Sequence, residues 1–234
     1  MTDARYVLGL GDDALIAAQR LAEWSSRAHD LEEDIALSNI ALDLLGQARM
    51  LLTYAGELEG AGRDEDALAY LRDDREFRNV QLVELPRGDF AAAVTRMLFF
   101  AAFQDLRYAA LAAGDDAALA GIAAKAGKET AYHLDHAAAW VLRLGGGTDE
   151  SRTRAQRAVD EQWPYTFELC QDVPRDDWSA VVDPVLAEAG LTRPDDADVK
   201  FRPAGGREGV HTEHLGYLLA EMQHLHRSHP GATW

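Results

Sequence analysis

The side chains with the clearest potential for chemistry are two tetrads, Leu44-Leu45-Gly46-Gln47 and Thr130-Ala131-Tyr132-His133. Residues three apart on a helix lie one turn apart on the same face. A Glu-x-x-His tetrad therefore offers a carboxylate and an imidazole to one iron, and bundles that bind two irons use two such tetrads plus a carboxylate from each of two further helices. Here only His133 is a ligand type, so the pattern predicts a site whose iron ligands have been replaced.

Apolar residues that return every three to four positions predict that both tetrads lie on long helices. We expect core helices over 12–27, 32–57, 89–113 and 117–144, shorter ones over 64–71 and 75–85, and additional ones over 148–171, 178–189 and 208–228. Gly145-Gly146-Gly147 predicts a helix end, Thr148 an N-cap, and Pro164 a kink near Trp163. No stretch shows sustained strand alternation, which indicates an all-α chain with a single domain over residues 1–234.

The order of these helices indicates a particular bundle. The first two core helices and the last two each form an antiparallel hairpin, and a connection of about 30 residues joins the hairpins. Two hairpins with one long crossover are the ferritin-like topology, rather than up-down-up-down. We therefore predict a ferritin-like helical bundle with extra C-terminal helices.

The hairpin turns predict which residues share the ligand level. About 15 residues from the second turn, near Gly114, the two arms reach Phe100 and the Thr130–His133 tetrad. The matching level of the first hairpin holds the stretch Ile16–Gln19 and the Leu44–Gln47 tetrad. Two irons need carboxylate oxygens to neutralise and bridge them. The vestigial positions Leu44, Gln47, Phe100, Thr130 and His133 lack them, so we expect no catalytic, cofactor or metal residues in this chain.

Composition limits the classes of partner that the chain could bind. Forty acidic and 23 basic side chains give a net charge of −17, which repels nucleic acid and anionic lipid. Acidic pairs such as Asp12-Asp13 are interpreted as solvated helix faces, and this pair suits the start of the first core helix. The N-terminus lacks a basic region followed by a long apolar one, the longest apolar run is Met97–Phe103, and Cys170 is the only cysteine. These features predict a cytoplasmic protein without a membrane partner.

Three other groups of residues have two interpretations each. Glu129, His133 and His136 could form a metal site, but a surface ion pair or core histidine is simpler. His211 and His214 resemble a zinc pair without a third ligand, so we prefer a helix face at an interface between subunits. Glu76-x-x-Asn79 resembles a decayed Glu-x-x-His but is interpreted as a solvated turn with Arg75 and Arg78.

The remaining polar candidates are weak. Cys170 lacks an obvious activating partner and is interpreted as a buried small hydrophobe. Arg20, Arg49, Arg96 and Arg107 lie on core helices, and one or more of them could neutralise a carboxylate left inside the bundle.

Several longer segments resemble one protein family. They are LSNIALDLLGQARMLL (37–52), DREFRN (74–79), LVELPRGDFA (82–91), KETAYHL (128–134), WVLRLGGGTDES (140–151) and HTEHLGYLLAEMQ (211–223). The chain is identified by them as similar to the PaaC-type structural subunits of the bacterial phenylacetyl-CoA 1,2-epoxidase. In the catalytic sister subunits of that family, Glu-x-x-His glutamates stand where this chain has Leu44 and Thr130.

The resemblance implies a non-catalytic role in a multicomponent monooxygenase of aerobic phenylacetate catabolism. The implied partners are a catalytic subunit with a diiron centre, a small accessory subunit, and a reductase that uses NADPH, FAD and an iron–sulfur cluster. Two alternatives remain open. One is an active metal-dependent ferritin-like oxidoreductase with a nonstandard ligand set around His133. The other is a binding module for acyl-CoA. Its phosphates would need clustered arginine or lysine, and the modest basic cluster Arg152, Arg154 and Arg157 is interpreted as a plain helix face.

Overall fold

The computed structural model describes residues 2–232, and every regular element in that range is a helix. The described chain forms two compact units. Unit 1 comprises residues 2–86 together with 205–232, and unit 2 comprises residues 87–204. The prediction of an all-α protein is confirmed. The prediction of a single domain stays a prediction, and each of the two units contains one long-helix hairpin.

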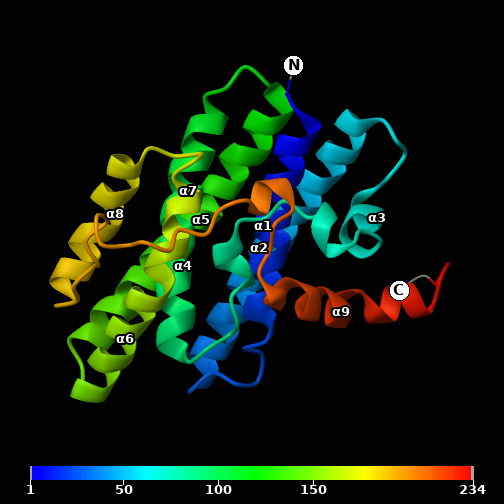
Figure 1. Ribbon diagram of the computed structural model, residues 1–234. Coiled ribbons are helices and arrows are strands. Elements are labelled where there is room, and N and C mark those ends of the chain that lie inside the picture. The colour runs from blue at the N-terminus through cyan, green and yellow to red at the C-terminus, as the bar shows by residue number, and fades with distance from the viewer. Residues whose placement is uncertain (1, 233–234) are drawn as a thin grey trace. The chain divides into compact units, whose positions relative to one another are not determined.

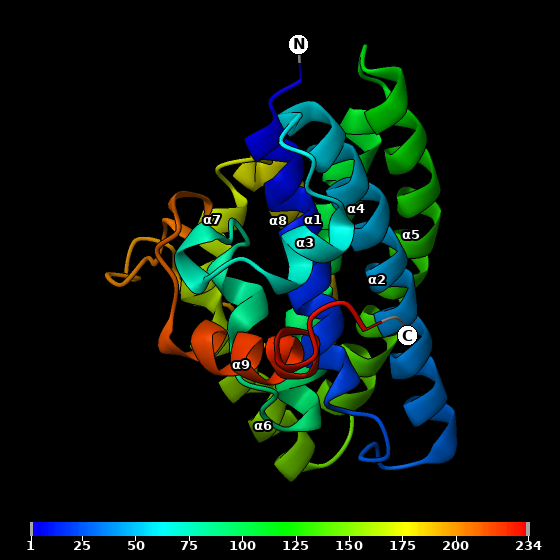
Figure 2. The same cartoon turned by 90° about the vertical axis from the view of Figure 1, so that its right-hand side faces the viewer.

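Unit 1 is built on the hairpin of α1 (Ala4–Ala22) and α2 (Leu31–Glu59), which lie side by side in both views (Figure 1, Figure 2). The connection after α2 contains α3 (Glu65–Tyr70) and two 3-10 turns, Asp74–Glu76 and Gln81–Glu84. A 3-10 turn, Gly206–Glu208, and α9 (Glu213–Ser228) return from the C-terminal part of the chain to complete this unit. The first and last parts of the sequence thus share one core.

Helix α1 differs most from its prediction, because it begins at Ala4 and ends at Ala22 instead of covering 12–27. Asp3 caps it by accepting a hydrogen bond from the Arg5 amide. Glycine usually weakens a helix, yet a Cβ on Gly11 would lie 2.8 Å from Cδ2 of Leu52, so this glycine permits close packing of α1 against α2. Asp12 and Asp13 therefore lie inside the helix and are buried, and their assignment to a solvated face was wrong.

Helix α2 is apolar on two faces. Leu37, Ile40, Leu44 and Leu51 are buried on one face. On the opposite face Leu31, Ile35, Leu42 and Leu45 are exposed, and we call these four residues the apolar stripe. At 100° per residue the stripe falls within one narrow sector of the helix. By length and composition α2 could cross a membrane, but 44% of its most apolar window is buried in the protein, and core helices of soluble proteins pass the same test.

Unit 2 is built on the hairpin of α4 (Phe90–Ala112) and α5 (Ala117–Gly145), both close to their predicted bounds. Helices α6 (Asp149–Gln162) and α8 (Arg175–Glu188) pack against this hairpin. The predicted helix over 148–171 is interrupted near Trp163, as Pro164 indicated: α6 gives way to a 3-10 turn, Trp163–Tyr165, and then to α7 (Thr166–Leu169). Thr148 caps α6 through the Ser151 amide, also as predicted.

Three aromatic side chains form the centre of unit 2. The rings of Phe99, Trp163 and Trp178 lie 5.5–5.6 Å apart between centroids, and all three are fully buried. Each indole N–H has an acceptor: Trp163 donates to Asp196 and Trp178 to the Phe99 carbonyl. Trp24 is likewise buried, in unit 1, whereas Trp140 is only half-buried.

Three other predicted helices have different limits. The segment 75–85 forms two 3-10 turns instead of one helix, 178–189 begins earlier at Arg175, and 208–228 begins later at Glu213. The segments 75–85 and 208–212 differ from their predictions because buried ionic contacts hold them in extended or turn conformations.

Candidate functional site

In unit 1, the residues predicted at the ligand level are buried in the α1–α2 hairpin. Leu44 is 3% exposed and Gln47 is 0% exposed, both on the inner face of α2, and Ile16 is buried on α1. Leucine and isoleucine offer no lone pair to a cation. Gln47 offers only a neutral amide, which is a poor substitute for imidazole at a transition-metal site. This half of the expected site is apolar packing with one amide group.

In unit 2, Phe100 on α4 and Thr130 and His133 on α5 are also buried. Phe100 packs near Phe103, with ring centroids 6.1 Å apart. The Thr130 hydroxyl oxygen is buried and has no hydrogen-bond partner among the residues that the structure describes. His133 is therefore the only strong ligand type at the five predicted positions, and no carboxylate accompanies it there.

The donor set does not fit a diiron centre. Such a centre needs several carboxylate oxygens around the two metals, and the five predicted positions supply none. Between residues 2 and 232, no group of three or more His, Cys, Asp or Glu side chains could hold a metal ion. The alternative of an active oxidoreductase around His133 thus receives no support from the geometry. Glu129, its other candidate ligand, forms an i, i+4 ion pair with Lys125 at 3.9 Å.

The most elaborate polar site was missed by the sequence interpretation, and it begins at Asp12. Arg72 donates two hydrogen bonds to this carboxylate, one of them 3.0 Å long, and the Arg78 amide donates a third at 2.8 Å. Asp12 and Arg72 are both fully buried. The Arg72 guanidinium also lies over the Phe77 ring, 4.1 Å from its centroid. This pair fastens the start of the crossover segment to α1.

Asp13 forms the second part of the same network. Its carboxylate accepts two hydrogen bonds from Arg207, at 2.9 and 2.7 Å, and one from the Val80 amide at 2.8 Å. Arg207 also donates to the Gly9 and Arg78 carbonyl oxygens. A Cβ on Gly9 would lie 3.1 Å from an Arg207 nitrogen, so glycine leaves room for this side chain. Asp13 thereby joins α1, the crossover and the segment before α9.

Glu84 and His211 form the third part. His211 Nδ1 lies 3.1 Å from Glu84 Oε1, and His211 Nε2 lies 3.0 Å from the Phe77 carbonyl oxygen. The other Glu84 oxygen accepts bonds from the amide and hydroxyl of Thr212. Burial raises the pKa of Glu84, and the hydrogen bond from His211 opposes that rise. Since Glu84 is fully buried and well bonded, its role is to hold the segment before α9 in place.

These contacts correct two interpretations of the sequence. His211 precedes α9 and its buried side chain contacts Glu84 of the same chain. It is therefore not part of a helix face at an interface between subunits. Glu76 is exposed and completes a capping box with Asp73, as expected for a turn, but Asn79 is fully buried and donates to the Val80 carbonyl.

The arginines singled out from the sequence have several partners. Arg20 bonds the Glu84 and His214 carbonyl oxygens and Glu23, and Arg96 bonds the Arg87 carbonyl. Arg49 pairs with Glu65 at the surface, and Arg107 pairs with the half-buried Asp172. Arg72 and Arg207, which the sequence analysis did not single out, neutralise the buried Asp12 and Asp13.

The arginines of the basic cluster on α6 also have partners within the chain. Arg154 and Arg157 both pair with Asp89, at 3.7 and 2.8 Å, and Arg152 donates to the Gly145 carbonyl. Cys170 is half-buried and has a neighbour that the sequence did not indicate, because Arg175 Nη1 lies 3.5 Å from its sulfur. Burial nevertheless raises the pKa of the Cys170 thiol.

Comparison with known proteins identifies the family of this chain. The sequence model of the family described as "Phenylacetic acid catabolic protein" matches residues 1–176 and 171–234. The chain belongs to this family. A relative from Escherichia coli (strain K12), named as one of the subunits of 1,2-phenylacetyl-CoA epoxidase, is 44% identical over 246 aligned residues, which cover 98% of each chain.

Membership of the phenylacetic acid catabolic protein family confirms the resemblance stated from the sequence segments. The match extends over the whole chain, so it includes both units and the C-terminal segment that carries Arg207 and His211. The buried network and the five predicted ligand positions thus lie within the residues that this family's model matches.

Proposed function

We propose that this chain is the non-catalytic structural subunit of a multicomponent phenylacetyl-CoA 1,2-epoxidase. The observation that carries the proposal is chemical: Leu44, Gln47, Phe100 and Thr130, which we predict at ligand positions of a diiron bundle, are buried and include no carboxylate or imidazole. The name of the 44% identical relative supports membership of an epoxidase complex. In this proposal the diiron centre belongs to a catalytic partner protein. A small accessory subunit and a reductase with NADPH, FAD and an iron–sulfur cluster complete the system.

The apolar stripe of α2 is the surface that we assign to the catalytic partner. Leu31, Ile35, Leu42 and Leu45 are 71%, 53%, 63% and 46% exposed, although leucine and isoleucine usually lie inside proteins. Exposed apolar residues gathered on one face often mark a protein–protein interface. The stripe lies opposite the face of α2 that packs in its own core, so a partner could cover it without disturbing the hairpin.

Metal analysis and turnover test the non-catalytic role. The full chain is purified alone and co-purified with the diiron subunit. Iron is measured in both samples, and epoxidation of phenylacetyl-CoA is measured after the accessory subunit, the reductase, NADPH and O2 are added to each. We expect stoichiometric iron and activity only in the sample with the partner. Stoichiometric iron in the chain alone, lost on His133→Ala, would overturn the proposal.

A matched pair of leucine variants tests the surface. Leu42→Asp places a charge in the stripe, whereas Leu225→Asp places the same charge on α9, where Leu225 is 53% exposed. Size-exclusion chromatography with the diiron subunit should show loss of the complex for Leu42→Asp and retention for Leu225→Asp. Retention of the complex by both variants would contradict the assignment of the stripe.

A further inference from the structure

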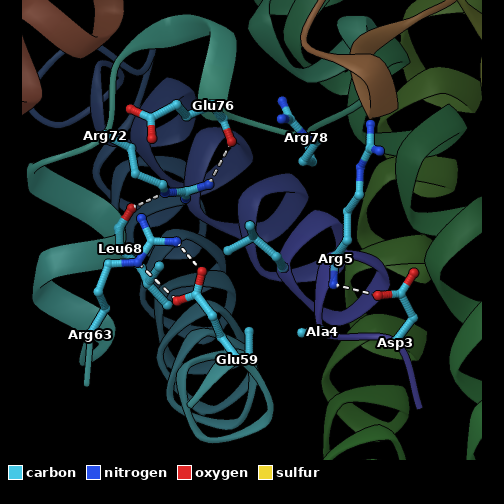
Figure 3. A pocket seen from close by; sticks show the side chains of 11 residues that line it. Asp3, Ala4, Arg5, Glu59, Arg63, Leu68, Arg72, Glu76 and Arg78 are labelled. Atoms are coloured by element: carbon cyan, nitrogen blue, oxygen red, sulfur yellow. Dashed lines mark hydrogen bonds and ion pairs between the residues drawn. The ribbon is translucent and has the colours of Figure 1, made fainter. Parts of the chain in front are cut away.

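A pocket of about 390 Å³ lies in unit 1, between the N-terminal end of α1, the C-terminal end of α2 and the crossover segment. Four arginines line it: Arg5, Arg63, Arg72 and Arg78. Figure 3 shows Arg5 and Arg78 extending toward the same part of the pocket, with Arg63 and Glu59 across from them. In a chain with a net charge of −17, four guanidinium groups around one cavity are a local exception.

The carboxylates around this pocket already accept hydrogen bonds. Asp3 accepts from the Arg5 amide, Glu59 from Arg63, and Glu76 from the Asp73 amide. The buried Asp12 neutralises Arg72. The acidic groups at the pocket are thus engaged, and the spare hydrogen-bonding capacity belongs to donors.

Arg78 holds most of that spare capacity. Its Nη1 donates to the backbone carbonyls of Arg75 and Phe77, while Nε and Nη2 have no partner among residues 2–232, and no carboxylate in that range pairs with it. Burial and the nearby charge of Arg5 lower the pKa of Arg78. Arg5 engages the Arg207 carbonyl and Glu208 through Nη2 alone, which leaves donors on that side chain as well.

The position of Arg78 is built into the backbone. Gly209 has a φ of +78°, a backbone conformation that residues with a side chain rarely adopt. A Cβ at this residue would lie 2.8 Å from Arg78 Nη1. The Arg78 amide is held by Asp12. The guanidinium is therefore placed at the pocket by a glycine and a buried carboxylate.

We propose that this pocket binds a small organic anion, whose phosphate or carboxylate head is held by Arg78 and Arg5 and whose apolar body lies against Leu8, Ala55 and Leu68. Guanidinium groups bind both kinds of head through paired, charge-assisted hydrogen bonds. The three apolar side chains line the same pocket. Its volume exceeds that of a bare phosphate and lies at the small end of ligand sites. The inference is independent of the proposed structural role.

Titration calorimetry on the intact chain tests the proposal with four probes. Phenyl phosphate and benzoate carry a head and a body, inorganic phosphate is a head alone, and benzyl alcohol is a body with no charge. We expect saturable one-to-one binding of phenyl phosphate or benzoate, weaker binding of inorganic phosphate, and none of benzyl alcohol. The tighter of the first two identifies the head. Methyl chemical shifts of Ala55 and Leu68 should move during the titration.

Charge-matched variants complete the experiment. Arg78→Gln should weaken binding at least about tenfold, the loss expected for one charge-assisted bond, and Arg5→Gln provides a second test at an exposed residue. Arg154→Gln removes the same charge from α6 in unit 2 and should leave the affinity unchanged. No saturable binding by the unmodified chain up to about 10 mM probe, a level that detects even millimolar affinity, would overturn the proposal. An affinity that neither Arg78→Gln nor Arg5→Gln lowers would do the same.

Discussion

His211 lies between Glu84 and the Phe77 carbonyl oxygen, 3.1 and 3.0 Å from them through its two ring nitrogens. A carbonyl only accepts, so Nε2 carries a hydrogen, and one further proton lies between Nδ1 and Glu84. That proton makes either an imidazolium with a carboxylate or an imidazole with a carboxylic acid. The pair is uncharged overall in both arrangements, which explains how it can be buried.

This proton inventory predicts different outcomes for two substitutions of Glu84. Glu84→Gln keeps an acceptor for Thr212 and offers an N–H to His211, so its effect on stability should be small. Glu84→Ala leaves His211 and the Thr212 hydroxyl and amide without their partner, and should cost about 1–3 kcal/mol per buried group left unpaired. Urea unfolding of the intact chain measures both. Equal losses would contradict the inventory.

The pH dependence of the same pair has a definite sign. Burial raises the pKa of Glu84 in the folded protein, so the folded state holds this proton more tightly than the unfolded chain. The contribution of Glu84 to stability is then present below its ordinary pKa of about 4.3 and declines as the pH rises through the raised value. As the pH rises through that raised value, the unfolding free energy of the natural chain should fall relative to that of Glu84→Gln. A natural chain that instead gains stability relative to Glu84→Gln with rising pH would refute this assignment.

The Asp12–Arg72 pair should be far more costly to break than a surface pair. Asp12→Ala leaves the buried Arg72 charge uncompensated, for which about 3–5 kcal/mol is expected. Arg49→Ala removes an ion pair to Glu65 whose arginine side chain is 76% exposed, and should cost about 0–1 kcal/mol. Chemical unfolding of the two variants provides the comparison. Similar losses would mean that Asp12 is not buried as described.

The buried Thr130 hydroxyl predicts a substitution without penalty. Its hydroxyl is buried and has no partner among the described residues, so Thr130→Val should be neutral or slightly stabilising. Thr166→Val is the matched control, because that buried hydroxyl donates to the Trp163 carbonyl and accepts from Arg175. The control should lose about 1–3 kcal/mol. Thermal unfolding that ranked the two variants in the opposite order would show that Thr130 has a polar partner.

Two glycines of α5 should respond oppositely to alanine. A Cβ on Gly145 would lie 2.8 Å from the Ala189 Cβ and closer still to its carbonyl oxygen, so Gly145→Ala should push α8 away and destabilise unit 2. A Cβ on Gly121 would meet nothing within 4 Å, and Gly121→Ala should add about 0.5–1 kcal/mol of helix stability. Melting temperatures should therefore shift in opposite directions.

Local signals in the sequence predicted much of the fold. Pro164 indicated the break after α6, Gly145–Gly147 the end of α5, and Thr148 the N-cap of α6, since each acts within a few residues of itself. Apolar residues at spacings of three to four also indicated that α2 is a long helix. These features need no knowledge of distant partners.

The parts that were missed depend on residues far apart in the chain. Asp12 lies 60 residues from Arg72, and Asp13 lies 194 residues from Arg207. Without those partners an Asp-Asp pair suggests a solvated helix start, and Gly9 and Gly11 suggest a chain that is not yet helical. The burial of all four residues follows from long-range contacts that no local pattern records.

The division of unit 1 between the two ends of the sequence has a consequence for biosynthesis. Residues 87–204 leave the ribosome before the segment that carries Arg207 and His211, so Asp13 and Glu84 must await these counterparts until translation is nearly finished. A polypeptide that ends before Gly205 would contain the whole of unit 2 but only part of unit 1. In it, Asp13 would lack Arg207 and Glu84 would lack His211.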